Sequence, residues 1–160
     1  MLRIGITGHM NLTPATAGLV THAIRDLLSA FQPEEITGVS CIAAGADSIF
    51  ASQVLDLGGR LEVVLPAADY RERKVKPDHA ATFDRLIGRA NQVPVMPHAE
   101  SNRAAYEDAN EAMLSSCDLL FAVWDAQPAV DRGDTASVVE QARSRGLSVE
   151  IVWPEGAQRG

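Results

Sequence analysis

The sequence has little of what marks several classes of protein. It contains two cysteines among 160 residues, and neither Cys41 nor Cys117 has a second cysteine or a histidine at metal-ligand spacing. We therefore expect two buried structural thiols, no metal site and no cofactor. No apolar run approaches the length of a membrane span, and the N-terminal MLRIGITGHM is too short and too glycine-broken for a signal peptide. We expect a cytoplasmic protein whose first strand lies in this segment.

Positive charge is also scarce. The chain carries 14 Lys and Arg against 21 Asp and Glu, a formal net charge of −7, which would repel a polyphosphate backbone. Binding to nucleic acid would therefore need a local basic patch, and only Arg71, Arg73, Lys74 and Lys76 form such a cluster. We interpret this cluster as part of a solvated loop and do not expect a nucleic-acid partner.

The length and the patterning of the chain predict one domain, residues 1–160. Alternating or continuous apolar residues predict strands at 2–7, 36–43, 61–65, 93–96, 119–124 and 147–153. Apolar residues at helical spacing predict helices at about 14–31, 46–57, 80–90, 101–117 and 135–145. Strand alternating with helix predicts the α/β class, with a single-domain open parallel sheet, helices on both faces and a Rossmann-like arrangement. The longest predicted loop ends near residue 78.

Three strand-to-helix turns carry small and polar residues. The turns contain Thr7, Gly8 and His9; Gly45, Ala46, Asp47 and Ser48; and the segment from Asp125 to Thr135. In an open parallel sheet these turns share one edge, where glycine lets the backbone approach a ligand and helix N-termini bind anions. Together they predict a nucleotide-phosphate pocket, although the fingerprint GxGxxG is absent. Each turn alone would also suit tight packing or helix capping, as Asp47 and Ser48 could.

Several side chains near these turns have two interpretations. His9 either contacts the ligand or titrates at the pocket mouth, or it lies on the surface beside a helix. Trp124 and Tyr106 either stack on a nucleobase or pack in the core. Asp125 either binds a ribose hydroxyl pair or acts as a base, or it caps the following turn.

Four stretches of the sequence resemble the SLOG superfamily, which includes the LOG phosphoribohydrolases and the DNA-processing protein A family. The stretches are GITGHM, IAAGADSIFA, GRLEVVLPAADYRE and SSCDLLFAVWD followed by DRGDTASVVEQAR. They occur in order and span most of the chain. The resemblance implies a parallel α/β domain, commonly dimeric, that binds a nucleotide-like ligand at the turns named above.

The chain also departs from this pattern. Many relatives have Arg in place of Met10 and Gly in place of Asp134. The LOG enzymes have a catalytic Glu where this chain has Val138. At about 100° per residue, Glu140 lies on nearly the opposite side of the helix from the position that Val138 occupies. The usual catalytic carboxylate is therefore missing. Asp134 either caps the helix of Thr135, with Arg132 offsetting its charge, or faces the ligand.

Three functions fit these observations. The first is a sensor or carrier that binds a nucleotide-like small molecule, as a homodimer or higher homo-oligomer, and its pocket is shaped by Thr7, Gly8, Gly45, Ala46, Asp47, Gly133 and Thr135. The second is a hydrolase that cleaves nucleoside monophosphates, with Asp125 or Asp134 as the catalytic carboxylate and His9 or Arg103 holding the substrate. The third, binding of single-stranded DNA, conflicts with the net charge of −7.

Overall fold

The sheet is parallel and has five strands in the order β3-β2-β1-β4-β5. The structure is a computed structural model that describes residues 1–128 and 134–160. The strands are β1 Leu2–Gly8, β2 Ile36–Ser40, β3 Arg60–Val63, β4 Leu119–Val123 and β5 Ser148–Ile151. β1 is central, and its Ile4 lies opposite Gly38 of β2 and Leu119 of β4. The chain builds outward from β1 to β3 and then returns to the other side of β1, so the predicted open Rossmann-like sheet is confirmed.

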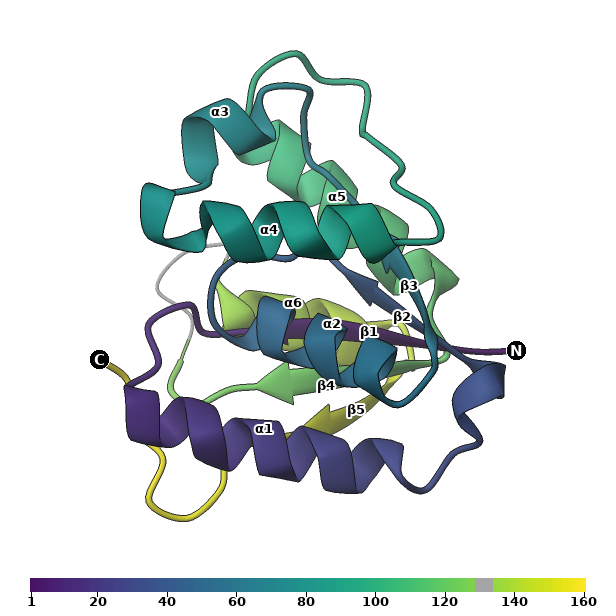
Figure 1. Cartoon of the computed structure of the whole chain (residues 1–160), viewed down its shortest axis with the longest axis vertical. Helices are drawn as coiled ribbons and strands as arrows, with labels where there is room; N and C mark the ends of the chain where they lie inside the picture. Colours follow the sequence, from purple (N-terminus) through teal and green to yellow (C-terminus); the bar gives the residue numbers. More distant parts are fainter. Residues whose placement is uncertain (129–133) are drawn as a thin grey trace.

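Helices cover both faces of this sheet. They are α1 Pro14–Leu28, η1 Pro33–Glu35, α2 Ala46–Asp56, α3 Tyr70–Lys74, α4 Pro77–Arg89, α5 Arg103–Ser116 and α6 Thr135–Ser144. In Figure 1, α2 lies in front of the strands and α6 lies behind them. The predicted placement of helices on both faces is therefore confirmed. None of the helices in the described part of the chain is long and apolar enough to cross a membrane.

The apolar core divides into three clusters that follow these layers. On one face, Val20 and Ile24 of α1 pack with Phe50 of α2 against the sheet. On the other face, Met113 of α5 and Val138 of α6 pack against β4. A third cluster joins α2, β3, α3 and α4 beyond the β3 side of the sheet. Apolar residues at helical spacing explain why α1 buries one side, whereas α2 is buried on more than one side and joins two clusters.

Side-chain caps fix where α1 and α5 begin. Thr13 accepts a hydrogen bond from the Thr16 backbone N–H at 3.2 Å, and Pro14 occupies the first helical position. This start was predicted, because proline has no N–H to leave unpaired there. Asn102 caps α5 in the same way by accepting from the Ala105 N–H at 2.9 Å. The end of α1 differs from the prediction, because the helix stops at Leu28 and the chain then turns before residue 31.

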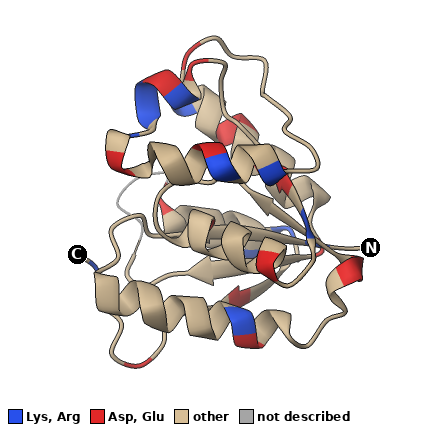
Figure 2. Ribbon diagram, viewed as in Figure 1, with Lys and Arg blue, Asp and Glu red and all other residues tan. Residues whose placement is uncertain are grey.

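The predicted basic loop is wrong. Residues 70–74 form α3, and α4 begins at Pro77 rather than at residue 80. Arg71 pairs with Asp84 of α4 through two hydrogen bonds of 2.8 and 2.7 Å, which fastens the two helices together. Figure 2 shows that acidic residues lie among the basic ones here. The cluster is therefore helical and partly neutralised, because its charges have partners that sequence spacing does not reveal.

The segment at 93–96 is an edge element, as its proline predicts. Isolated parallel bridges join Glu62 to Gln92 and Leu65 to Val95. The Leu65 N–H donates to the Pro94 carbonyl at 2.9 Å, and the Met96 N–H donates back to the Leu65 carbonyl at 2.9 Å. This irregular pairing extends the sheet past β3 and leads the chain toward α5.

Candidate functional site

A cavity of about 570 Å³ opens at the C-terminal ends of the central strands. This is the size of a typical small-molecule site, and the position is the one that ligands occupy in open α/β sheets. Its walls come from the end of β1 and the turn after it, from the segment after β2, from α2, α3 and α5, from the start of α6 and from residue 159. The residues that line it are Ile6, Thr7, Gly8, His9, Met10, Asn11, Cys41, Ala43, Asp47, Tyr70, Arg103, Tyr106, Glu107, Asn110, Asp134, Thr135, Val138 and Arg159.

Two glycines bring the first two turns into direct contact. A Cβ on Gly8 would lie 2.5 Å from the Ala46 Cβ, so only glycine lets β1 pass this close to α2. Gly45 has φ +81°, and its Cβ would lie 2.6 Å from the His9 carbonyl oxygen. The Ala46 N–H donates to that same carbonyl at 3.2 Å. Gly8 lines the cavity, whereas Gly45 and Ala46 build the wall from behind.

His9 is buried, with 8% of its surface exposed, so the surface interpretation is wrong. Its Nε2 accepts a hydrogen bond from the Asp125 N–H at 3.1 Å. Burial and the nearby Arg159 lower the pKa of His9, although the Asp125 carboxylate, 3.3 Å from Nε2, opposes this. The ring is therefore neutral at pH 7 and uses Nε2 as an acceptor, which ties the turn after β1 to the end of β4.

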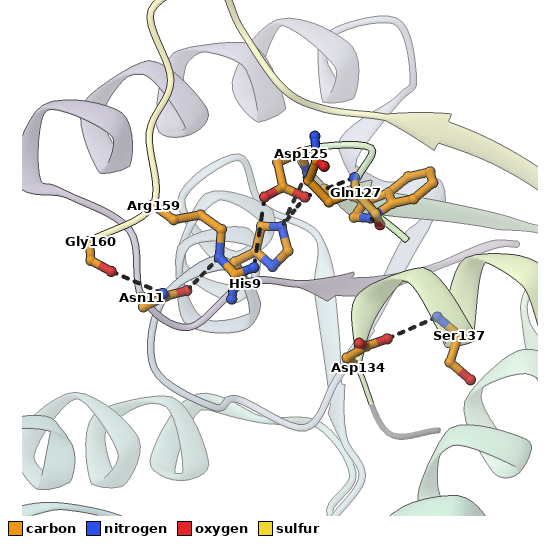
Figure 3. Close-up of polar contacts among 9 residues, drawn as sticks. His9, Asn11, Asp125, Gln127, Asp134, Ser137, Arg159 and Gly160 are labelled. Atoms are coloured by element: carbon orange, nitrogen blue, oxygen red, sulfur yellow. Dashed lines mark hydrogen bonds and ion pairs between the residues drawn. The ribbon is translucent and has the colours of Figure 1, made fainter. Parts of the chain in front are cut away.

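Asp125 belongs to this network and does not line the cavity. Partial burial would raise its pKa, but a hydrogen bond from the Gln127 N–H, the His9 ring and Arg159 together hold the pKa below its usual range. Figure 3 shows His9, Asp125 and Arg159 pointing toward one another. Trp124 also lies outside the cavity lining, and its indole Nε1 donates to the Gln127 carbonyl at 3.0 Å.

Residues 158–160 supply a part of the site that sequence reasoning missed. Arg159 forms an antiparallel bridge with Leu12, and its Nε donates to the Asn11 side-chain oxygen at 3.0 Å. Asn11 in turn donates from Nδ2 to the Gly160 carbonyl at 3.1 Å. These contacts place the Arg159 guanidinium on the cavity wall, 3.7 Å from Asp125. No local pattern links residues almost 150 positions apart, so nothing in the sequence signals this arrangement.

Asp47 lies on the cavity wall and does not cap its helix. The N-cap of α2 is Gly45, which makes no side-chain capping bond. Burial raises the pKa of Asp47 to about 7, against a smaller opposing effect from a hydrogen bond with the Ala43 backbone. Ser48, the next residue, turns away from the cavity and donates to the Ala43 carbonyl at 2.7 Å. Asp47 is therefore the residue of this turn that is available to a ligand.

An aromatic pair lines the same cavity as this carboxyl group. Tyr70 of α3 and Tyr106 of α5 meet edge to face, with ring centroids 6.3 Å apart. Tyr70 was hidden from sequence reasoning because its segment was predicted to be a loop. Asn110 lies one helical turn after Tyr106 on the same wall, and Arg103, at the first position of α5, lies one turn before it.

The start of α6 forms the remaining wall. Asp134 is the N-cap and accepts a hydrogen bond from the Ser137 N–H at 3.2 Å, so the capping interpretation is confirmed, while the same residue also lines the cavity. Figure 3 shows it apart from the network around His9. Val138 is buried and faces the cavity where the enzymes of the resembled family carry Glu, and Glu140 is exposed. Gly133 lies outside the described residues.

The ligand-binding residues predicted from the sequence fall into two groups. Thr7, Gly8, His9, Asp47, Arg103, Asp134 and Thr135 line the cavity, and Gly45, Ala46, Ser48, Trp124 and Asp125 lie outside its lining. Across residues 1–128 and 134–160, no group of three His, Cys, Asp or Glu side chains could hold a metal ion. What the cavity offers is hydrogen-bonding groups, aromatic rings and two arginines.

Comparisons with known proteins support the fold. No family model and no curated protein matches the sequence. Among solved structures, DNA processing protein A from Streptococcus pneumoniae aligns with 98% of this chain at a TM-score of 0.73 and 18% identity. The chain spans 52% of that protein.

Two further structures extend the comparison. DNA processing protein A from Helicobacter pylori, described with its single-stranded DNA binding mode, aligns with 99% of this chain and 68% of its own length, at a TM-score of 0.69 and 14% identity. The molybdenum cofactor binding protein from Rippkaea orientalis aligns with 94% of this chain and 75% of its own length, at a TM-score of 0.59 and 15% identity. The chain therefore has the SLOG-type Rossmann-like fold that these proteins share.

Proposed function

We propose that the chain binds a nucleotide or a nucleotide-derived small molecule in the cavity at the C-terminal edge of its sheet, as a sensor or carrier. The observation that carries the proposal is a cavity of about 570 Å³ in which some polar wall groups are not used to hold the fold. Among the described residues, the side chains of Thr7, Asn110 and Thr135 make no hydrogen bond. Polar groups left open in an otherwise apolar cavity are the pattern of a ligand site.

The chemistry of the walls suits a nucleotide. Arg103 and Arg159 supply positive charge for a phosphate, and the edge-to-face pair of Tyr70 and Tyr106 supplies a surface for a base. The fold is shared with a protein described as binding the molybdenum cofactor, which supports a small molecule as the ligand. Val138 on the cavity wall leaves no carboxylate at the usual catalytic position, which supports binding over catalysis.

Calorimetric titration with mononucleotides, cyclic nucleotides and ADP-ribose-like compounds tests the proposal. Thr135→Val removes one hydroxyl from the cavity wall without changing side-chain shape and should weaken binding about fivefold or more. Thr21→Val is the matched control, because its hydroxyl donates to the Ala17 carbonyl on α1, outside the cavity lining. No binding by the unmodified protein at millimolar concentration would end the proposal, and mass spectrometry of co-purifying molecules would identify the ligand directly.

A second candidate is cleavage of the N-glycosidic bond of a nucleoside monophosphate. Asp134 favours it, because this carboxylate lies on the cavity wall and could stabilise oxocarbenium charge or activate water. Asp125, the other carboxylate considered, lies in the network with His9, outside the lining. Release of free base that disappears in Asp134→Asn and persists in Asp125→Asn would establish hydrolysis at Asp134. Absence of base release by the unmodified protein would exclude this candidate.

Single-stranded DNA remains a third candidate, since the Helicobacter pylori protein of the same fold is described as binding it. The net charge of −7 and the pairing of Arg71 with Asp84 both oppose it. A gel shift at low salt measures this directly, and electrostatic binding must weaken steeply as the salt concentration rises. Sedimentation of the same samples tests the expected homodimer or higher homo-oligomer.

A further inference from the structure

The carboxyl group of Asp47 is desolvated, and the fold makes little use of it. It neither caps α2 nor joins an ion pair among the described residues, and its side chain lies on the wall of the cavity. Taking a carboxylate out of water without a compensating cation is unfavourable. A group that weakens the fold and faces a ligand cavity is a candidate for ligand recognition.

The surroundings of Asp47 favour its neutral form. Cys41, the residue after β2, Tyr70 of α3 and Tyr106 of α5 line the same cavity. Burial raises the pKa of each of these three groups, so all remain neutral near pH 7 and none offers Asp47 a positive charge. On the side of α4, His79 places Nε2 2.9 Å from the Ile42 carbonyl and 3.2 Å from the Ser48 hydroxyl. The remaining titratable or charged groups on the cavity wall are His9, Arg103, Glu107, Asp134 and Arg159.

We infer that Asp47 selects the ligand by pairing, as a neutral carboxyl group, with a heterocyclic edge that carries one hydrogen-bond donor beside one acceptor. A neutral carboxyl has one O–H donor beside a carbonyl acceptor, whereas a carboxylate only accepts. Such edges include the N1 and amino group of adenine and the N1–H and carbonyl of hypoxanthine and guanine, and guanine alone of these three can also turn two adjacent donors to a carboxylate. The planes of Tyr70 and Tyr106 lie at 72° to each other, so one ring would stack on such a base and the other would meet it edge-on. This inference rests on the proposed function and names the base class that the same cavity would take.

Titrations of the full chain with AMP and GMP at pH 6 and pH 8 test it. The pKa of Asp47, about 7, leaves roughly one tenth of the groups neutral at pH 8, so AMP affinity should fall about tenfold between the two pH values. GMP presents two adjacent donors, N1–H and the 2-amino group, to a carboxylate, so its affinity should not fall in parallel. Changes in phosphate charge affect both ligands alike and therefore cancel in the comparison.

Asp47→Asn is the matched variant, because an amide also offers a donor beside an acceptor at every pH. At pH 6 its affinity for AMP should lie within about threefold of that of the unmodified protein. The part of the pH dependence that comes from Asp47 should be lost, because the other wall groups are unchanged. Asp47→Leu should weaken AMP binding about tenfold or more at both pH values, with its thermal unfolding measured to show that it folds. Asp47→Asn keeps the test decisive if the leucine variant does not fold.

The opposing outcomes are distinct. The inference is overturned if the AMP affinity of the unmodified protein and of Asp47→Asn changes equally with pH, or if it rises with pH. Unimpaired AMP binding by Asp47→Leu would overturn it as well. In each of these cases nucleotide binding itself would stand. If the unmodified protein binds none of the nucleotides at millimolar concentration, the proposed function fails and this inference fails with it.

Discussion

Asp47 and Asp125 follow strands on either side of β1, yet their surroundings are opposite. Asp47 lies against thiol and aromatic walls, and burial raises its pKa to about 7. Asp125 is also partly desolvated, but the Gln127 N–H, His9 and Arg159 outweigh this and lower its pKa. One carboxyl group is satisfied by the protein and fastens two turns together, and the other remains available to a ligand. The same residue type is thus held by the protein at Asp125 and takes, in our proposal, a recognition role at Asp47, according to its partners.

Breaking the contact between the turn of Asp47 and the turn of His9, which holds Asp125, should have the largest effect on stability. Gly45 lies at this contact with φ +81°, and an added Cβ would meet the His9 carbonyl oxygen at 2.6 Å. Gly45→Ala should therefore lower the free energy of unfolding by about 3 kcal/mol or more, measured by urea denaturation. Gly18→Ala is the control, because no atom lies within 4 Å of its added Cβ and alanine favours a helix. Equal losses in the two variants would contradict the close contact at Gly45.

Neutralising Asp47 should stabilise the protein. Its folded pKa is raised, so the folded state binds more protons than the unfolded state between pH 4 and pH 7, and stability falls across that window as the pH rises. Three pKa units correspond to at most about 4 kcal/mol, and water in the cavity lowers this to an expected gain of about 2 kcal/mol for Asp47→Asn at pH 8. Urea denaturation at pH 4, 6 and 8 should show the gain growing with pH. A less stable variant at pH 8 would mean that the carboxylate holds the fold.

Neutralising Asp125 should do the opposite. Its folded pKa is lowered, so its contribution to stability is present above the unfolded pKa of about 3.9 and is lost as the pH falls further. Asp125→Asn should reduce the free energy of unfolding by about 1 kcal/mol at pH 6, and the difference should shrink by pH 3. The same denaturation series measures both aspartates. If the stability differences of Asp47→Asn and Asp125→Asn changed with pH in the same direction, the contrast between the two aspartates would be wrong.

Asp134 caps α6 and also lines the cavity, and replacing it with glycine should have the smallest effect on stability of these changes. Asp134→Ala removes the hydrogen bond to the Ser137 N–H and should cost about 1 kcal/mol, whereas Asp134→Gly should cost only a few tenths. Calorimetry of the glycine variant then isolates its role in binding. Higher affinity for AMP would mark Asp134 as a cap whose charge repels phosphate. Lost affinity would mark it as a group that contacts the ligand.

Much of the fold and part of the cavity could be predicted from the sequence. The start of α1 at Pro14 followed from Thr13 and the missing proline N–H, and the burial of β4 between two strands followed from its uninterrupted apolar run. The helix α3 was missed because its charged residues resemble a loop. The ion pair of Arg71 with Asp84 joins α3 to α4, and local spacing in the sequence does not show such a contact. Tyr70 was lost from the predicted site for the same reason.

The sequence by itself determined the alternation of the strands with the longer helices, the start of α1 and the edge of the sheet where polar turns gather. These features depend on periodicity and on contacts over a few residues. Tertiary structure alone decided that the pKa of Asp47 is raised, that the Asp125 backbone N–H donates to His9, and that Arg159 reaches the cavity. The physical reason is that desolvation and hydrogen bonding at a side chain depend on which distant segments pack around it, and those neighbours come together only in the folded chain.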